Sequence, residues 1–124
     1  MNKFFGYFLL LTAALLFTAG CEDEPSIPIV KTDSVVPGST TAEVDGLIIS
    51  DGGSRVTRFG ICISTDTDKP VVENSSGPFY TGSISGTFSM TIPQLEPNTV
   101  YYVRAFADNK LGTGYGKTIT FTTE

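Results

Sequence analysis

The part of the chain that follows residue 26 predicts an all-β fold in which two antiparallel sheets pack as a sandwich. Short runs of β-branched and aromatic residues alternate with clusters of Gly, Pro, Asn, Asp and Ser, the pattern of strands separated by turns. Several runs are apolar at every second position, as a strand with one buried face requires. No run keeps a helical period. Seven short strands with frequent turns favour a two-sheet sandwich.

The strands are predicted in chain order from these patterns. The first is an edge strand, because an edge can spare the amide hydrogen that Pro28 lacks. The turn sequence Asp-Gly-Gly-Ser at 51–54 ends the second strand, and the third places Phe59, Ile61 and Ile63 on one face. The predicted strands cover residues 27–31, 41–49, 56–64, an optional 71–72, and the regions around 88–92, 101–105 and 117–123, with 74–86 as a loose connection.

Residues 1–20 predict a cleaved signal peptide. A single early cation, Lys3, precedes an almost unbroken apolar run at 4–17, and small residues follow at 18–20. The apolar run is shorter than the roughly 20 residues that a membrane-spanning helix needs. We therefore interpret the segment as a signal and not as an anchor.

The mature protein is expected to begin at Cys21. Residues 18–21, Thr-Ala-Gly-Cys, resemble the lipobox of bacterial lipoproteins, although Leu usually stands where this chain has Thr18. The resemblance implies cleavage before Cys21 and a covalent lipid on its sulfur, which would anchor the protein to a membrane. Ordinary cleavage without a lipid is the alternative.

Residues 21–26 form the expected lipidated cysteine and acidic tether. The acidic run Glu22-Asp23-Glu24 resembles the export signal that sends Bacteroidetes lipoproteins to the outer membrane, facing the cell exterior. The periplasmic face is the alternative location. The run also has a simpler interpretation as a solvated tether.

The charge balance and the cysteines exclude several classes of function. Loss of residues 1–20 removes only Lys3 among charged residues, so seven cations and thirteen anions remain and the net charge is −6. Such a surface offers no basic patch, and we expect no nucleic-acid partner. With Cys21 lipidated, Cys62 is the only free thiol, so no internal disulfide can form. We expect Cys62 to be a small, half-buried apolar residue.

Residues 95–105, Leu-Glu-Pro-Asn-Thr-Val-Tyr-Tyr-Val-Arg-Ala, resemble the turn and sixth strand of fibronectin type III domains. The sequences at 51–53, 112–116 and 122–123 fit the same family. The resemblance implies a seven-stranded, antiparallel immunoglobulin-like sandwich over residues 27–124. The main departure lies near Gly46, where the family's core tryptophan would fall. This chain has no tryptophan, so another side chain must fill that volume.

The resemblance also implies a structural role for Tyr101. Its position matches the tyrosine corner, in which a phenol near the start of the sixth strand bonds to the backbone a few residues upstream.

The sequence offers almost nothing for catalysis. The chain has no histidine, which excludes Ser-His-Asp and Cys-His arrangements. Asp66 and Asp68 flank Thr67 in a turn, where carboxylates most often cap backbone amides. A calcium site built from these two carboxylates is the alternative, but the spacing lacks the glycine and distal glutamate of a dedicated loop. We expect a protein that is not an enzyme and has neither a metal nor another cofactor.

The outer face of the sheet that contains the third and sixth strands carries unusual residues. Tyr102, Phe106 and Tyr115 could form an exposed apolar stripe with Arg104 as a polar handle, which suits a protein or glycan partner. The alternative is structural: an aromatic ring packs over the bare backbone of Gly60.

Two more aromatic residues, Phe79 and Tyr80, stand in an otherwise small and polar loop. They either cap the core in place of the missing tryptophan or contact a ligand.

Two functional hypotheses remain. The first is a non-catalytic, lipid-anchored surface module for adhesion or complex assembly, with a protein partner in the same outer membrane. The second is a carbohydrate-binding surface lipoprotein that supports glycan capture, which needs an aromatic platform with hydrogen-bonding groups around it.

Overall fold

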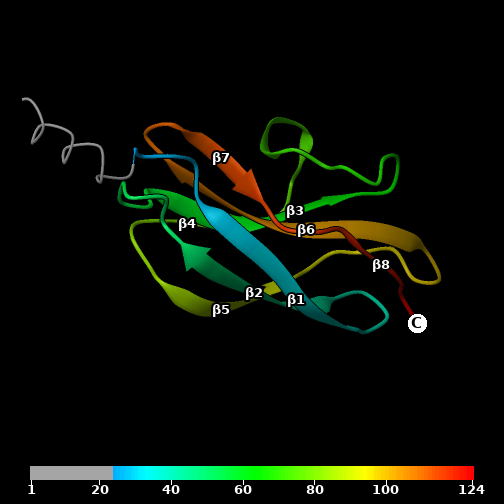
Figure 1. The fold of residues 1–124 in the computed structure, drawn as a ribbon. Helices are drawn as coiled ribbons and strands as arrows, with labels where there is room; N and C mark the ends of the chain where they lie inside the picture. Colours follow the sequence, from blue (N-terminus) through cyan, green and yellow to red (C-terminus); the bar gives the residue numbers. More distant parts are fainter. Residues whose placement is uncertain (1–23) are drawn as a thin grey trace, which may run out of the picture.

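The computed structural model describes residues 24–124, which fold into two antiparallel sheets packed face to face (Figure 1). The predicted signal peptide and Cys21 lie outside the described residues. The described part contains no helix long and apolar enough to cross a bilayer. The strands are β1 (Ile29–Pro37), β2 (Ala42–Ser50), β3 (Arg58–Ser64), β4 (Phe79–Thr81), β5 (Gly86–Ile92), β6 (Val100–Asn109), β7 (Gly112–Tyr115) and β8 (Ile119–Thr122), with one 3-10 turn, η1 (Val72–Asn74).

The strand order confirms the predicted sandwich. One sheet has the order β1-β2-β5, and the other has the order β4-β3-β6-β7 with β8 also paired to β6. The described chain has eight strands where seven were predicted. The difference is small, because β7 and β8 pair with successive parts of the same strand, β6, and act as one interrupted last strand.

The interruption between β7 and β8 has a local cause at the crossing of β1. The buried Thr32 side chain of β1 reaches the other sheet, where its Oγ1 accepts a hydrogen bond from the Ala105 amide at 2.9 Å. Gly116 passes directly over this residue, and a Cβ there would lie 2.5 Å from Thr32 Oγ1. The Thr32 hydroxyl therefore supplies an acceptor for the Ala105 amide, at the point where β6 is paired with neither β7 nor β8.

Three of the predicted segments differ from the structure. The first strand spans 29–37 instead of 27–31, because it pairs with β2 as far as Pro37, while Pro28 lies just outside the ladder. The connection at 74–86 contains the short strand β4, which pairs with β3 through residues 79–81. The optional strand at 71–72 is instead the start of the η1 turn.

Phe88 fills the volume that the family's tryptophan would occupy. Its ring lies over Gly46, its register partner on β2, and a Cβ at Gly46 would come within 2.5 Å of the ring. The same ring packs edge-on against Phe59, with 5.0 Å between the centroids. The glycine on one strand thus makes room for the aromatic ring on its neighbour.

Tyr101 fixes the loop before β6. Its Oη accepts a hydrogen bond from the Glu96 amide at 2.8 Å, the contact expected for a tyrosine corner. The buried Thr123 holds the same loop from the other side, since its Oγ1 donates to the Glu96 carbonyl at 2.6 Å and accepts from the Thr99 amide at 2.9 Å. The turn between β5 and β6 is therefore held by side chains.

Replacing Tyr101 with Phe should lower the free energy of unfolding by about 1 kcal/mol, because the Glu96 amide loses its acceptor. Urea denaturation would measure the change. Tyr102→Phe is the matched control, since it removes a neighbouring hydroxyl that does not accept the Glu96 amide, and it should cost much less. Equal stability of the wild type and Tyr101→Phe would refute a tyrosine corner.

Candidate functional site

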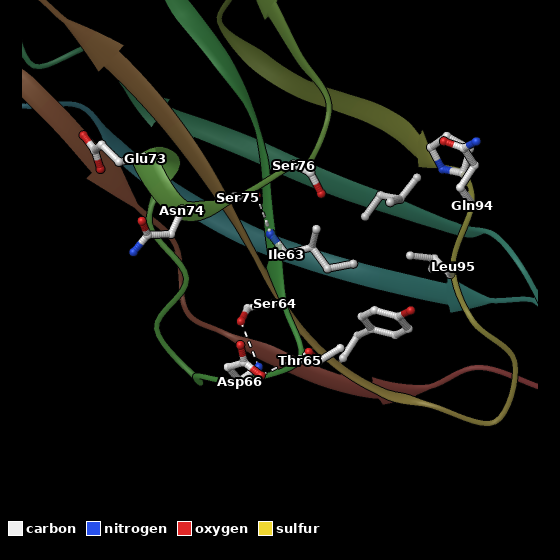
Figure 2. Close-up of a pocket in the computed structure, with 13 residues that line it drawn as sticks. Ile63, Ser64, Thr65, Asp66, Glu73, Asn74, Ser75, Ser76, Gln94 and Leu95 are labelled. Carbon is white, nitrogen blue, oxygen red and sulfur yellow. Dashed lines mark hydrogen bonds between the residues drawn. The ribbon is translucent and has the colours of Figure 1, made fainter.

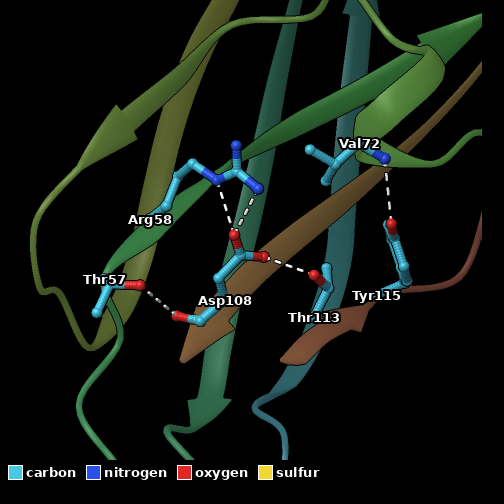
Figure 3. Close-up of polar contacts among 6 residues, drawn as sticks. All are labelled: Thr57, Arg58, Val72, Asp108, Thr113 and Tyr115. Carbon is cyan, nitrogen blue, oxygen red and sulfur yellow. Dashed lines mark hydrogen bonds and ion pairs between the residues drawn. The ribbon is translucent and has the colours of Figure 1, made fainter. Parts of the chain in front are cut away.

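The outer face of the β3-β6-β7 sheet is covered by residues 69–78, which we call the cover segment. Arg104 Nε donates a hydrogen bond to the Pro70 carbonyl at 2.7 Å. The Val72 amide donates to Tyr115 Oη at 3.1 Å, as Figure 3 shows. Pro70 itself is almost completely buried. Side chains of the sheet thus hold the backbone of the cover segment.

Arg104 and Tyr115 form a stacked pair beneath the cover segment. The Arg104 guanidinium carbon lies 3.9 Å from the centre of the Tyr115 ring, a cation–π contact. Burial is the main cause that raises the pKa of the Tyr115 phenol above its usual value. Both side chains are half-buried. Their contacts are to the protein itself.

The expected exposed stripe does not form, because the cover segment lies over it. Only 2% of Phe106 is exposed, while Tyr102, Arg104 and Tyr115 are half-buried. The alternative for Gly60 also needs correction. A Cβ on this residue would collide with the Pro78 carbonyl and with Phe79 Cα, so backbone and not only an aromatic ring approaches Gly60.

Cys62 is buried more fully than the sequence suggested. Its exposed fraction is 1%, and burial raises the pKa of its thiol from 9.0 to about 12, with Arg104 opposing the shift. The thiolate, which is the reactive form, is therefore almost absent at neutral pH. Cys62 behaves as a small apolar residue.

In the native protein at about pH 8, iodoacetamide should alkylate Cys62 far more slowly than it alkylates the urea-unfolded chain, where the thiol is partly ionised. Because folding raises the thiol pKa, its contribution to stability is complete below pH 9 and is lost as the pH rises toward 12. Mass spectrometry of timed samples measures the first effect. Equal alkylation rates in both states would contradict the burial of this thiol.

An ion pair orders the edge of the sheet next to β4. Both Arg58 Nε and Nη2 contact Asp108 Oδ2, at 2.7 and 2.6 Å, and Thr113 donates to the other carboxylate oxygen at 2.7 Å (Figure 3). The same guanidinium lies 5.3 Å from the Phe79 ring and 5.5 Å from the Phe106 ring. Arg58 thus links the first residue of β4 to the body of the sheet.

Phe79 and Tyr80 remain exposed on the edge strand β4, and we call this pair the aromatic edge. Their exposed fractions are 50% and 57%. The Tyr80 ring touches the core residue Phe59, with centroids 5.6 Å apart, but it does not take the place of the missing tryptophan, which Phe88 fills. β4 pairs only with β3, so within residues 24–124 its other edge has no neighbouring strand.

An open groove of about 710 Å³ lies on the same side of the sandwich, between the end of β3 and the segment that follows β5. Ile63, Leu95 and Tyr101 supply apolar surface, and Figure 2 shows Ser76, Ile63 and Leu95 turned toward the space between these segments. Gln94 lies at the rim with φ at 62°, a left-handed conformation that costs energy for any residue other than glycine.

The lining of the groove is polar but carries no cation. Its charged residues are Asp66 and Glu73, and the remaining polar residues are amides and hydroxyls. Such a lining disfavours anionic ligands and suits uncharged groups that donate hydrogen bonds. No local sequence pattern reveals this groove, because residues from four separate segments meet there only in the folded chain.

Asp66 and Asp68 belong to no larger cluster of metal-binding side chains in the part of the chain that the structure describes. No cluster of three Cys, Asp or Glu side chains suited to a metal occurs among the described residues. The predicted capping role is also wrong in detail: Ser64 Oγ accepts from the Asp66 and Thr67 amides, and Thr67 Oγ1 accepts from the Lys69 amide. The hydroxyls cap this turn, while the Asp66 carboxylate accepts a hydrogen bond from the Thr65 hydroxyl at 3.3 Å.

Comparisons with solved structures agree on the fold. The sensor domain of the anti-sigma factor RsgI4 from Pseudobacteroides cellulosolvens is similar, with a TM-score of 0.59 and 14% identity over 81% of this chain and 97% of that domain. A structure of PhoD gives 0.54 and 17%, over 82% of this chain and 20% of that one. A set of titin domains gives 0.50 and 22%, over 82% of this chain and 32% of theirs.

No protein-family model and no curated protein sequence matches the chain. The likeness to solved structures, at such low identity, concerns the fold alone. Together with the strand order and the Tyr101–Glu96 bond, it establishes the class of fold. The described chain therefore has an immunoglobulin-like fold of two packed antiparallel sheets.

Proposed function

We propose that this chain is a non-catalytic, lipid-anchored module of the cell surface that binds a protein partner through the aromatic edge, Phe79 and Tyr80. The carrying observation is that these two rings stay about half exposed while Phe106 is buried beneath the cover segment. Aromatic residues are enriched at protein interfaces because they bury a large area at a small cost in side-chain entropy.

The backbone of β4 supports the same function. A free strand edge can pair with an extended segment of a partner, and alternate side chains then supply specificity. Phe79 is prearranged for such contact, because Arg58 stacks on its ring and is itself held by Asp108. A prearranged side chain loses less entropy on binding.

The proposed anchor is a lipid on Cys21, and the proposed location is the outer membrane, facing the cell exterior, with the periplasmic face as the alternative. The residues between Cys21 and the start of the domain are few, so the domain would stay close to its membrane. This closeness favours a partner in the same membrane over a distant one.

The photoreactive analogue of phenylalanine at position 79 should give one discrete cross-linked product on intact cells, because this ring contacts the partner. Tyr80→Ser should weaken that product. The same analogue at position 36 is the control, since Val36 is 63% exposed on the other sheet. The absence of any product at position 79, or the same product at both positions, would contradict the proposed interface.

The groove favours a second function, the binding of a neutral glycan. Amides and hydroxyls at its rim can bond to sugar hydroxyls, while Tyr101 and Leu95 offer apolar surface to the face of a sugar ring. The absence of a cation in the lining argues against uronic or phosphorylated sugars. In such a site, the strained left-handed backbone at Gln94 would serve to position this residue at the rim.

Gln94→Gly tests the glycan hypothesis without unfolding the protein. The change removes the rim amide but relieves the left-handed strain, so stability should rise by about 1 kcal/mol while binding is lost. Quenching of tyrosine fluorescence by neutral oligosaccharides is a suitable readout, since Tyr101 lines the groove and the chain has no tryptophan. Thr87→Ala, outside the groove on β5, should leave binding unchanged. If no neutral oligosaccharide quenches the wild type, the hypothesis fails.

A further inference from the structure

The end of the sandwich at which the chain enters is fixed by buried hydrogen bonds. Asn109, only 6% exposed, donates from Nδ2 to the Ser26 carbonyl at 2.7 Å and to the Asp51 carbonyl at 2.9 Å. The Ser26 amide donates to the Gly52 carbonyl at 2.8 Å. Ser26 is thus held to the body of the domain. Five residue steps separate Ser26 from Cys21 in the sequence and can span at most about 18 Å.

Exposed aliphatic side chains gather at this same end. Ile27 is 45% exposed and Leu111, in the turn between β6 and β7, is 48% exposed. Ile27 packs against the residue after Leu111, because a Cβ on Gly112 would lie 3.2 Å from Ile27 Cγ2. We call Ile27 and Leu111 the aliphatic tip. Ile29 and Ile49, at 54% and 58%, lie on the adjoining outer face of the first sheet.

We propose that the aliphatic tip rests on the surface of the bilayer to which Cys21 is attached, so that the domain has a fixed orientation on its membrane. The inference rests on the anchoring proposed above. The occupant follows from the direction of the chain: the described residues begin at residue 24, at this end of the domain (Figure 1), and Cys21 precedes that residue by three positions in the sequence. If the aliphatic tip did not touch the bilayer, its side chains would be exposed to water next to a lipid surface.

The charges at this end permit contact with uncharged lipid. The exposed cations Arg55 and Lys110 flank the tip, and the exposed acids Glu24 and Asp51 lie beside it. The tether adds Glu22 and Asp23, so this end is acidic overall; an anionic surface would repel it, but an uncharged one would not. The long aliphatic stem of Lys110 can also lie along lipid while its ammonium group stays in water.

A weak contact is enough, because the tether makes it intramolecular. A short link gives an effective concentration in the range of about 1 mM or above, so a surface affinity too weak to recruit the free domain still orients the tethered one. In this orientation the aromatic edge faces sideways, toward neighbours in the membrane. The groove lies near the opposite end, where β3 and β5 finish, and opens away from the membrane.

Hydrogen exchange on vesicles tests the orientation. The mature chain, residues 21–124, is coupled through the Cys21 thiol to a maleimide lipid in phosphatidylcholine vesicles, and Cys62 does not compete because it is buried. We expect several-fold slower amide exchange at residues 26, 27 and 110–112 than in protein whose Cys21 carries a small maleimide. The turn at 38–41, at the opposite end of β1, should exchange at the same rate in both samples.

Two double variants distinguish protection caused by contact of the aliphatic tip with the bilayer from protection caused only by closeness to it. Ile27→Ser with Leu111→Ser should abolish the protection, whereas Val36→Ser with Val100→Ser, which removes exposed aliphatic residues at the other end, should keep it. Protection that survives in the first variant, or that never appears in the wild type, would overturn the proposal. Because the lipid is attached chemically, this result does not depend on lipidation in cells, which the mass of the native protein tests separately.

Discussion

The attachment of the cover segment to the outer face of the β3-β6-β7 sheet decides which side chains of that face are exposed. Arg104, stacked on Tyr115, donates to the Pro70 carbonyl, while the Tyr115 phenol receives the Val72 amide. These contacts bury Phe106 and Cys62 and thereby turn the outer face of the sheet into a second, smaller packed layer. The same segment then supplies one wall of the groove and delivers the chain to β4.

The glycines show how closely this arrangement is packed. Gly60 lets the backbone of residues 78–79 approach β3, and Gly46 leaves the space that the Phe88 ring occupies. In both places a single methyl group would collide with a neighbour, so the absence of a side chain is a packing requirement. The space beside Gly46 is thereby filled by an aromatic ring that comes from the adjacent strand.

The three surface features lie on different parts of one rigid body. The aliphatic tip lies where the chain enters, the aromatic edge lies along β4, and the groove lies near the far end of β3 and β5. Asn109 fixes the entry point, and the Arg58–Asp108 pair fixes the residue that begins β4. In the proposed orientation, the aromatic edge of the lipid-anchored domain would face neighbours in the same membrane, and the groove would face the medium.

The sequence by itself determined the sandwich, because period-two apolar patterns and turn residues are local signals. It also predicted the tyrosine corner at Tyr101, because the resemblance lies in one continuous stretch, residues 95–105, that includes this residue. Only the tertiary structure decided which aromatic residues are exposed. Phe106 and Phe79 look alike along the chain, but one lies under the cover segment and the other on a free edge. Burial depends on contacts between residues far apart in sequence, and neither the cover segment nor the groove has a local pattern that reveals it.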